Sequence, residues 1–445
     1  MGKREKIFSK FLRNQVLLIG MLFAGDQIFG FFEQNYLNTY LDQVLFLQPL
    51  FISLMVSLSA VVGLITNISW GITSDNTRSK YGRRRPYLLF SLVSGVAMIL
   101  FAFSINLAAG DNMLAYIFCI ILDVIIIGIT SNAYYVSERS LIPDTVDMER
   151  RGRANGVVNN VGYLGLLIAV AVFVISELLF GYDAPGDETH IGQAGHIFAL
   201  SIGGAAFMLT GLLGFFFIKE KSVSELLPKK SFFTEIKEIF DVEQFKANKD
   251  FFKIVLALTV FRTGISVIMP FLFIWIFALG FETEILILIV LTSFVILFGT
   301  TTLLGNLADK HGRRKYIPIS IIITCIGLFI APFVKLGGIT NLVLAFFVLP
   351  FVLVAILGLI TPMNAWAQDL IPEDKRGKFF GILNIIFTIS QIIGSTIGGL
   401  VAQYFLIGGF VPESFVFVFA PLFFLASIPL FLKVKETLIK KDSKE

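Results

Sequence analysis

The chain has 445 residues, of which 56% are hydrophobic and 15% are charged, with a net charge of +4 and a mean hydropathy of +0.82. Soluble proteins carry about 25% charged residues, so this composition excludes an ordinary soluble domain.

Apolar segments recur along the whole chain, and each is long enough to cross a membrane. A hydrocarbon core about 30 Å thick needs about 20 helical residues. The sequence therefore predicts an all-α membrane protein with twelve transmembrane helices. The predicted spans are 15–41, 50–73, 87–107, 113–136, 154–180, 196–218, 251–279, 284–305, 317–335, 341–366, 379–405 and 411–434.

The basic residues lie on one side of this arrangement. The two tails and the alternate loops hold 34 of the 36 Lys and Arg residues, and the two exceptions are Arg262 and Lys335. Positive residues collect on the cytoplasmic side of a membrane, so both termini are predicted to be cytoplasmic in a multi-pass protein of the cell membrane. The net charge of +4 is then a signal of topology, and it does not indicate nucleic-acid binding.

The longest predicted cytoplasmic connection, residues 219–250, divides the spans into six and six. This predicts an N-terminal six-helix bundle in residues 1–218 and a C-terminal bundle with a short tail in residues 251–445. Apolar residues at helical spacing in the connection indicate an amphipathic helix on the membrane surface, with a plain linker as the alternative. They are Phe232, Phe233, Ile236, Ile239 and Phe240.

The two halves repeat two loop sequences in the same order. GITSDNTRSKYGRRRPY (71–87) follows span 2, and GNLADKHGRRKYIP (305–318) follows span 8. SLIPDTVDMERRGRANGVVNN (140–160) follows span 4, and DLIPEDKRGKFFGILNI (369–385) follows span 10. Matching landmarks at equivalent spans predict an internal duplication and two pseudo-symmetric halves.

These loops carry a family resemblance. GNLADKHGRRK resembles the loop signature of the major facilitator superfamily. DNTRSKYGRRRP, with RSLIPD and then RGRANG, is similar to the branch of melibiose-type glycoside, pentoside and hexuronide cation symporters and of sucrose/proton symporters. The resemblance implies the major facilitator fold and transport by alternating access.

The loop residues have predicted roles in gating. Gly82 and Gly312 allow a backbone turn that a side chain would obstruct. The resemblance implies that charged loop residues form a cytoplasmic latch of ion pairs, while attraction to lipid head groups and a specific anion site are alternatives. The candidate gating residues are Asp75, Arg83, Arg139, Asp144, Asp309 and Arg313.

Four ionisable residues within the predicted spans mark a candidate site, because such residues are costly in a membrane. They are Asp26, Glu33, Asp123 and Arg262. Asp26 and Arg262 lie about eleven residues into the first helix of each half, roughly 17 Å deep, and would face one cavity if the halves are symmetric. Access to water or solute could switch Asp26 between protonated and ionised forms, so it is the candidate coupling residue, with a static Asp26–Arg262 ion pair as the alternative.

Neutral polar and aromatic side chains within the spans could complete a sugar site, because amides both donate to and accept from hydroxyl groups. Helix packing is the alternative for each of them. The candidates are Gln27, Asn67, Asn132, Tyr135, Asn159, Tyr163, Asn364, Trp366, Asn384 and Gln391. The GxxxG pattern of GSTIG (394–398) predicts close helix packing on the same logic.

The resemblance also limits the choice of coupling ion. The two sodium-binding aspartates of the melibiose-type branch fall at Gly63 and Asn67, its second sugar-binding aspartate falls at Tyr135, and the last-but-one span lacks its lysine. In the sucrose-type branch, the coupling aspartate of span 4 falls at Gly128, although Asn132, Arg139 and Asp144 match. The melibiose-type sodium site is therefore absent, and protons are the expected coupling ion, with no metal or other cofactor. Facilitated diffusion stays open.

We therefore expect a secondary active transporter for a small polar solute, a sugar or glycoside, with proton symport. Its expected partners are this solute and the lipid bilayer, without nucleic acid, and it would function as a monomer. The alternatives are a carrier of lysolipids or other amphiphiles, a proton-coupled drug antiporter and a non-transporting membrane receptor. An enzyme is not expected, because the sequence lacks nucleophile, phosphate-loop, dinucleotide and metal-ligand motifs.

Overall fold

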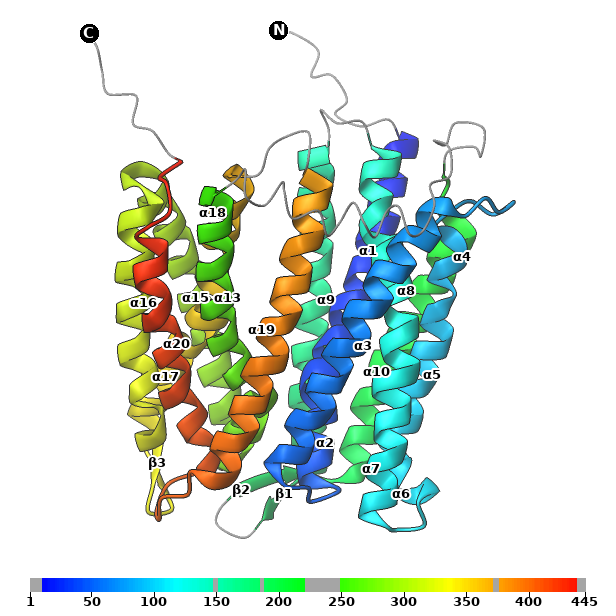
Figure 1. Cartoon of the computed structure of the whole chain (residues 1–445). Coiled ribbons are helices and arrows are strands. Elements are labelled where there is room, and N and C mark those ends of the chain that lie inside the picture. The colour runs from blue at the N-terminus through cyan, green and yellow to red at the C-terminus, as the bar shows by residue number, and fades with distance from the viewer. Residues whose placement is uncertain (1–9, 147–150, 185–187, 221–248, 371–375, 438–445) are drawn as a thin grey trace, which may run out of the picture. The chain divides into compact units, whose positions relative to one another are not determined.

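The computed structural model describes residues 10–146, 151–184, 188–220, 249–370 and 376–437. These residues are almost entirely helical (Figure 1), with two short two-stranded sheets, β1 (Gly181–Ala184) with β2 (Glu188–Ile191) and β3 (Lys335–Leu336) with β4 (Ile339–Thr340). Residues 221–248, which hold the predicted amphipathic helix, lie outside the described residues.

Within the described residues, twelve helices are long and apolar enough to cross a membrane, which confirms the predicted fold class. Eleven of them end close to the predicted bounds. The fourth differs most, because it spans Asn112–Thr145 and so continues nine residues past the predicted end at 136. The polar sequence SERS (137–140), which suggested a loop, is helical.

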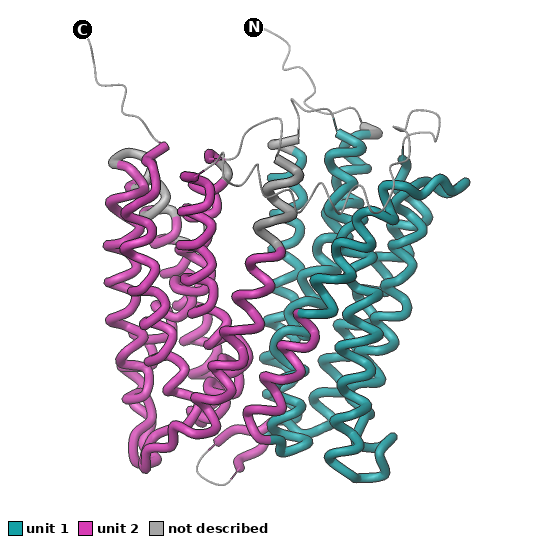
Figure 2. The backbone as a smooth tube through the Cα atoms, viewed as in Figure 1, with its two compact units in different colours: residues 1–47, 61–181, 191–235 teal, residues 48–60, 182–190, 236–445 magenta. Residues whose placement is uncertain are grey.

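The chain forms two compact units (Figure 2). Unit 1 comprises residues 1–47, 61–181 and 191–235, and unit 2 comprises residues 48–60, 182–190 and 236–445.

Unit 1 is built around the first helix of the chain, α1, which packs against α9 and α10, while α10 also packs against α5. Its helical elements are α1 (Lys10–Phe31), η1 (Phe32–Tyr36), α2 (Leu37–Gln43), the second half of α3 (Pro49–Asn76), α4 (Arg85–Leu88), α5 (Phe90–Ala102), α6 (Ser104–Leu107), α7 (Asn112–Ile120), η2 (Ile121–Ile127), α8 (Gly128–Thr145), α9 (Arg151–Phe180) and α10 (Gln193–Phe217).

Unit 2 is organised in a similar way around α13, which packs against α19 and α20. Its helical elements are α13 (Lys249–Ile268), η5 (Met269–Phe271), α14 (Leu272–Ala278), α15 (Thr283–His311), α16 (Arg313–Phe329), η6 (Ala331–Val334), α17 (Leu342–Leu353), η7 (Val354–Gly358), α18 (Ile360–Asp369), α19 (Arg376–Tyr404), η9 (Pro412–Phe415) and α20 (Val416–Phe431).

The first half of α3 belongs to unit 2, because its side chains and backbone form hydrogen bonds with side chains of α19. Ser57 Oγ lies 2.9 Å from Ser395 Oγ and 3.2 Å from Thr396 Oγ1. Leu50 N donates to Gln403 Oε1 at 3.1 Å. These small polar side chains allow two helices to pack closely, as is common in membranes.

Within the part of the chain that the structure describes, three spans contain a π-helical segment. These segments are η1 in span 1, η2 in span 4 and η7 in span 10. Glu33 lies in η1 and Asp123 in η2. Both carboxyl groups therefore lie where the helix geometry is unusual. π-bulges of this kind often occur at functional sites.

The predicted GxxxG packing is confirmed. A Cβ atom placed on Gly394 would lie 2.4 Å from the carbonyl oxygen of Thr263, and one on Gly398 would lie 2.4 Å from that of Val267. Only glycine allows α19 to approach the backbone of α13 this closely.

We expect Gly394→Ala to destabilise the protein by about 1–3 kcal/mol, because the added methyl group overpacks the contact between α13 and α19. Thermal unfolding in detergent would measure the effect. Gly299→Ala is the matched control, because a Cβ atom at Gly299 in α15 meets nothing within 4 Å. Equal stability of the two variants would contradict the packing role of Gly394.

Candidate functional site

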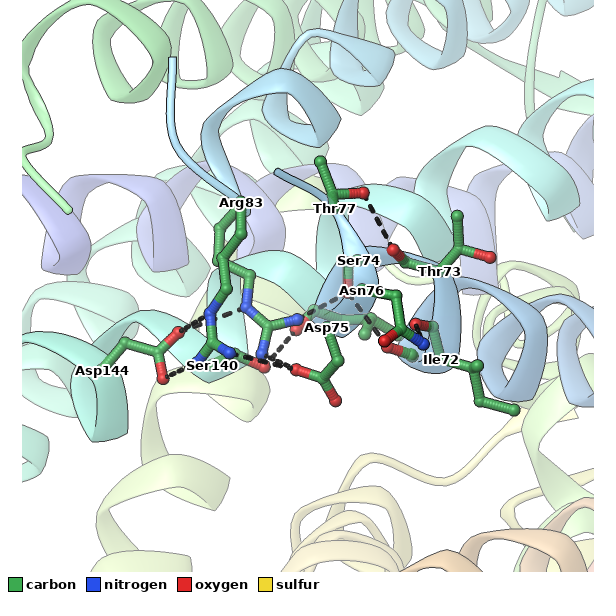
Figure 3. A network of polar contacts seen from close by, with 12 residues as sticks. Ile72, Thr73, Ser74, Asp75, Asn76, Thr77, Arg83, Ser140 and Asp144 are labelled. Carbon is green, nitrogen blue, oxygen red and sulfur yellow. Dashed lines mark hydrogen bonds and ion pairs between the residues drawn. The ribbon is translucent and has the colours of Figure 1, made fainter. Parts of the chain in front are cut away.

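Charged side chains meet at the end of α3, beside the last turn of α8 (Figure 3). Arg83 binds Asp144 through two bonds, from Nε at 3.2 Å and from Nη2 at 2.5 Å. Arg83 Nη1 also lies 3.7 Å from Asp75 Oδ1. Three of the predicted gating residues, Asp75, Arg83 and Asp144, are therefore neighbours in unit 1.

Arg84, which the sequence interpretation did not single out, is the most buried cation of this network, with 4% of its surface exposed. Its guanidinium group donates to Ser74 Oγ at 2.5 Å and to Asp144 Oδ2 at 3.2 Å, and it also pairs with Asp75. Arg84 thus connects the end of α3 to the end of α8.

Glu220, the third residue after the end of α10, is a second member of this network that the sequence interpretation did not single out. Its carboxylate accepts from the backbone N–H groups of Arg83 at 2.9 Å, Arg84 at 3.0 Å and Arg85 at 2.7 Å. These groups lie at the start of α4, where a helix attracts negative charge. Glu220 therefore fixes residues 82–85, here called the 82–85 turn.

Unit 2 repeats this arrangement at residues 312–315, the 312–315 turn. Arg314 N donates to Glu436 Oε2 at 2.9 Å, and Arg313 Nη1 donates to Asp369 Oδ2 at 2.7 Å. The sequences IKE (218–220) and VKE (434–436) also match, so this third repeat could have revealed both glutamates. The side chain of Asp309 lies outside the described residues.

The predicted glycine turns are confirmed in both units. Gly82 has φ +108° and Gly312 has φ +96°, which are backbone conformations that disfavour a side chain. A Cβ atom would also lie 2.6 Å from Glu220 Oε1 at Gly82 and 2.8 Å from Glu436 Oε2 at Gly312. Glycine therefore permits both the turn and the approach of the glutamate.

A second group of charged residues lies deeper in unit 1, within spans 1 and 4. Asp26 is 6% exposed and Asp123 is 4% exposed. Tyr135 Oη donates to Glu33 Oε2 at 3.3 Å, and the Arg139 guanidinium lies 5.6 Å from the centre of the Tyr135 ring.

These groups are also electrostatic neighbours. The positive charge of Arg139 attracts the carboxylate of Asp26, while the negative charges of Asp123 and Asp26 repel that of Glu33. Direct contacts therefore join Glu33, Tyr135 and Arg139, while Asp26 and Asp123 are buried residues of the same unit whose charges are within electrostatic range of Glu33. The prediction that residue 139 lies in a loop is wrong, because α8 continues to Thr145 and places Arg139 beside this carboxyl cluster.

The amide candidates of unit 1 fall into two groups. Asn67 Nδ2 donates to Asn132 Oδ1 at 2.5 Å, and Asn132 Nδ2 donates to Gly128 O at 2.6 Å, so these amides bond to each other and to the helix. Asn159 and Tyr163 are exposed on α9, whereas Gln27 is partly buried on α1 beside Asp26. Their part in binding a solute stays a prediction.

In unit 2, the Arg262 guanidinium lies 3.6 Å from the centre of the Phe387 ring. Its Nε atom has no hydrogen-bond partner among the described residues. Since Asp26 belongs to unit 1 and Arg262 to unit 2, their meeting in one cavity stays a prediction.

The other candidates of unit 2 have different surroundings. Trp366 is fully buried, and its indole N–H donates to Lys435 O at 3.0 Å, which is a packing arrangement. Asn364 is partly buried and Gln391 is exposed. The side chain of Asn384 lies outside the described residues.

Comparison with known proteins identifies the family. Residues 18–434, almost the whole chain, match the family described as MFS/sugar transport protein. The chain belongs to the major facilitator superfamily. The family and fold of this major facilitator chain are those of transporters and not of enzymes.

One curated relative of this major facilitator protein is the sucrose transport protein SUC3 of Arabidopsis thaliana. It is 28% identical over 156 residues, which cover 32% of this chain and 26% of the relative. The match thus spans about a quarter of that protein.

Solved structures share the fold over nearly the whole chain. A D-xylose-proton symporter has a TM-score of 0.69 at 16% identity, with 96% of this chain and 98% of that chain covered. The nucleoside transporter NupG has a TM-score of 0.64 at 14% identity, with 96% and 99% covered. A bacterial homologue of the human lysosomal transporter Spinster has a TM-score of 0.66 at 13% identity, with 95% and 97% covered. At these identities the likeness concerns the fold alone.

Proposed function

We propose that this major facilitator chain is a secondary active transporter that carries a sugar or glycoside together with protons by alternating access. The observation that carries the proposal is the burial of the Asp26 carboxyl group within the carboxyl cluster of unit 1. The positive charge of the Arg139 guanidinium attracts this carboxyl group when it is ionised. The family match and the partial match to a sucrose transport protein support a sugar as the solute.

The cluster has the chemistry that proton coupling requires. Three carboxyl groups, those of Asp26, Glu33 and Asp123, share a site in which Arg139 supplies positive charge. A membrane interior opposes unbalanced charge, so the binding and release of protons is the simplest way to balance this site. The transporter needs no metal or organic cofactor for this mechanism.

The protein is proposed to lie in the cell membrane. In the proposed orientation, both termini and the 82–85 and 312–315 turns are on the cytoplasmic side. The support is the distribution of Lys and Arg, 34 of 36 of which lie in the tails and alternate loops that the sequence predicts.

The test is uptake into proteoliposomes that contain the purified protein. Labelled glucosides and galactosides are offered under an imposed proton gradient, an imposed sodium gradient or neither, and protein-free liposomes are the control. We expect accumulation under the proton gradient and its loss when a protonophore is added.

Other outcomes point to other functions. Accumulation of no sugar under either gradient contradicts sugar symport, whereas uptake that only equilibrates indicates facilitated diffusion. Movement of a lysolipid or the proton-driven export of a drug would identify an amphiphile carrier or an antiporter. Binding without movement of any solute would indicate a receptor.

The latch residue Asp75 provides a test of gating. We expect Asp75→Asn to favour inward-facing states, because it removes a charge that holds Arg83 and Arg84 at the end of α3. The measurement is the labelling of single cysteines placed at the two ends of the spans, after Cys119 and Cys325 are replaced by serine.

Asp183→Asn is the matched control, because Asp183 is an exposed aspartate of β1. It should leave the labelling at both ends unchanged. The same unchanged labelling in Asp75→Asn would contradict the gating role.

A further inference from the structure

Arg262 is a cation inside a membrane span to which the described residues of unit 2 give no counter-charge. It lies 13 residues after Lys249, the start of α13, which is about 20 Å along the helix. Its buried Nε atom has no hydrogen-bond partner, and its guanidinium group makes no ion pair with a described residue. The side chain is partly exposed, so a ligand can reach it.

The helical elements of unit 2 that pack against α13 are α18, α19, α20 and η5, and none of them supplies a free carboxylate. The sequences of α20 and η5 contain no charged residue, and the charged residues of α19 are basic. Asp369 of α18 accepts from Arg313 Nη1 at 2.7 Å. Asp250 of α13 itself accepts from Lys253 Nζ at 2.8 Å, 12 residues before Arg262. Within these described elements, the charge of Arg262 is therefore unbalanced.

The guanidinium group of Arg262 is nevertheless held in a defined position. It lies over the ring of Phe387 in α19, 3.6 Å from the ring centre. This stacking occupies one face of the planar group, while the N–H donors at its edge stay available for a planar, bidentate acceptor.

An exposed amide lies beside this cation. Ser390 Oγ donates to Thr259 O at 3.1 Å, which holds this part of α19 against α13. Gln391, the next residue, is exposed and lies four residues after Phe387, so the two side chains are neighbours on one face of α19. A cation, an aromatic ring and an amide therefore form one surface of unit 2.

This surface has the chemistry to bind an anion that also carries hydroxyl groups. An unbalanced cation within a span is costly, and a carboxylate balances a guanidinium group with two parallel hydrogen bonds. An amide both donates to and accepts from hydroxyl groups. We propose that Arg262 binds a carboxylate of the transported solute and Gln391 its hydroxyl groups, so that the preferred solute is a sugar acid. The inference names the substrate class of the proposed transporter and rests on that function.

A carboxylate on the solute also changes the charge that each transport cycle moves. One proton and one carboxylate cross together without net charge, whereas one proton and a neutral glycoside carry one positive charge. Accumulation of a sugar acid should therefore respond to the pH gradient and not to the membrane potential.

The test compares pairs of ligands that differ at a single group. A methyl glucoside and the methyl glucuronide, and the corresponding galactoside and galacturonide, differ at C6, where a hydroxymethyl group is replaced by a carboxylate. Isothermal titration calorimetry of the purified protein measures the binding of each. In at least one pair we expect the acid to bind at least about tenfold more tightly than the neutral glycoside, and Arg262→Gln to reduce this ratio to about 1.

Lys253→Gln is the matched control, because Lys253 is a cation of the same helix that already pairs with Asp250. It should leave the ratio unchanged. If neither acid is preferred by the wild-type protein, or if Arg262→Gln weakens both members of a pair equally, the proposal is overturned. The second result is expected if Arg262 instead forms a static ion pair with Asp26.

Arg262→Lys keeps the measurement decisive if Arg262→Gln does not fold. Lysine keeps the positive charge but lacks the planar fork that binds both carboxylate oxygens. The preference of this variant for the acid should be smaller than that of the wild-type protein. An equal preference would contradict the bidentate role of Arg262.

Uptake into proteoliposomes separates this inference from the proposed function. A preference for the acid that depends on Arg262, without proton-driven uptake of any sugar, would reject proton symport and leave the binding role of Arg262 intact. Proton-driven uptake of neutral glycosides without any preference for the acids would reject only the role of Arg262. A potassium diffusion potential should leave the accumulation of the acid unchanged, and a clear dependence on this potential would contradict the joint movement of one proton with one carboxylate.

Discussion

Asp26→Asn is expected to abolish proton-driven accumulation while solute exchange continues. A 1:1 proton symporter can concentrate its solute about tenfold for each pH unit of gradient, so a gradient of two units supports about 100-fold accumulation. The amide keeps nearly the same shape as the carboxyl group but cannot bind or release a proton in this pH range. The accumulation ratio of the variant should therefore fall from about 100 to about 1.

The measurement combines uptake under the imposed gradient with equilibrium exchange of labelled for unlabelled solute. Exchange does not require net proton movement, so it reports whether the variant still folds and binds. Retained exchange with lost accumulation assigns coupling to Asp26. Full accumulation in Asp26→Asn would show that the coupling proton binds elsewhere.

Arg84→Ala is expected to cause the largest loss of stability among the latch variants. The 4%-exposed guanidinium of Arg84 bonds to Ser74 and Asp144 and pairs with Asp75. Removal of one partner from a buried ion pair costs about 3–5 kcal/mol. Since the side chains of Asp75 and Asp144 are 51% and 18% exposed, we expect a loss of about 3 kcal/mol in the free energy of unfolding.

Arg314→Ala is the control for this prediction, because Arg314 is the equivalent residue of the 312–315 turn. Arg314 is exposed, and its bond to Glu436 comes from the backbone N–H, which alanine retains. Its loss should stay within about 0.5 kcal/mol. Thermal or denaturant unfolding in detergent would compare the two variants, and equal losses would contradict the structural role of Arg84.

The spans and the loop repeats could be predicted from the sequence because their signals are local. A membrane requires about 20 apolar residues in a row, so hydropathy locates the helices without knowledge of their neighbours. The glycines of the 82–85 and 312–315 turns were predictable for a similar reason, since a backbone turn restricts the residue type at one position.

The position of Arg139 within a helix and the role of Arg84 could not be predicted in this way, because both depend on neighbours far along the chain. A span was expected to end at 136, where polar residues begin, but polar side chains can continue a helix when protein rather than lipid surrounds them. The sequence RRR (83–85) offers three equal cations, and the one that becomes buried depends on how α4 starts against Ser74 and Asp144.

The bonds of Glu220 and Glu436 impose an order on the assembly of each half during synthesis. Glu220 is 136 residues beyond Arg84, and Glu436 is 122 residues beyond Arg314. The N–H groups at each turn therefore cannot bond to their carboxylate until the sixth helix of that half has been synthesised. Since domains generally fold as units as they emerge, each turn can be fixed once its own sixth helix and the following glutamate have appeared.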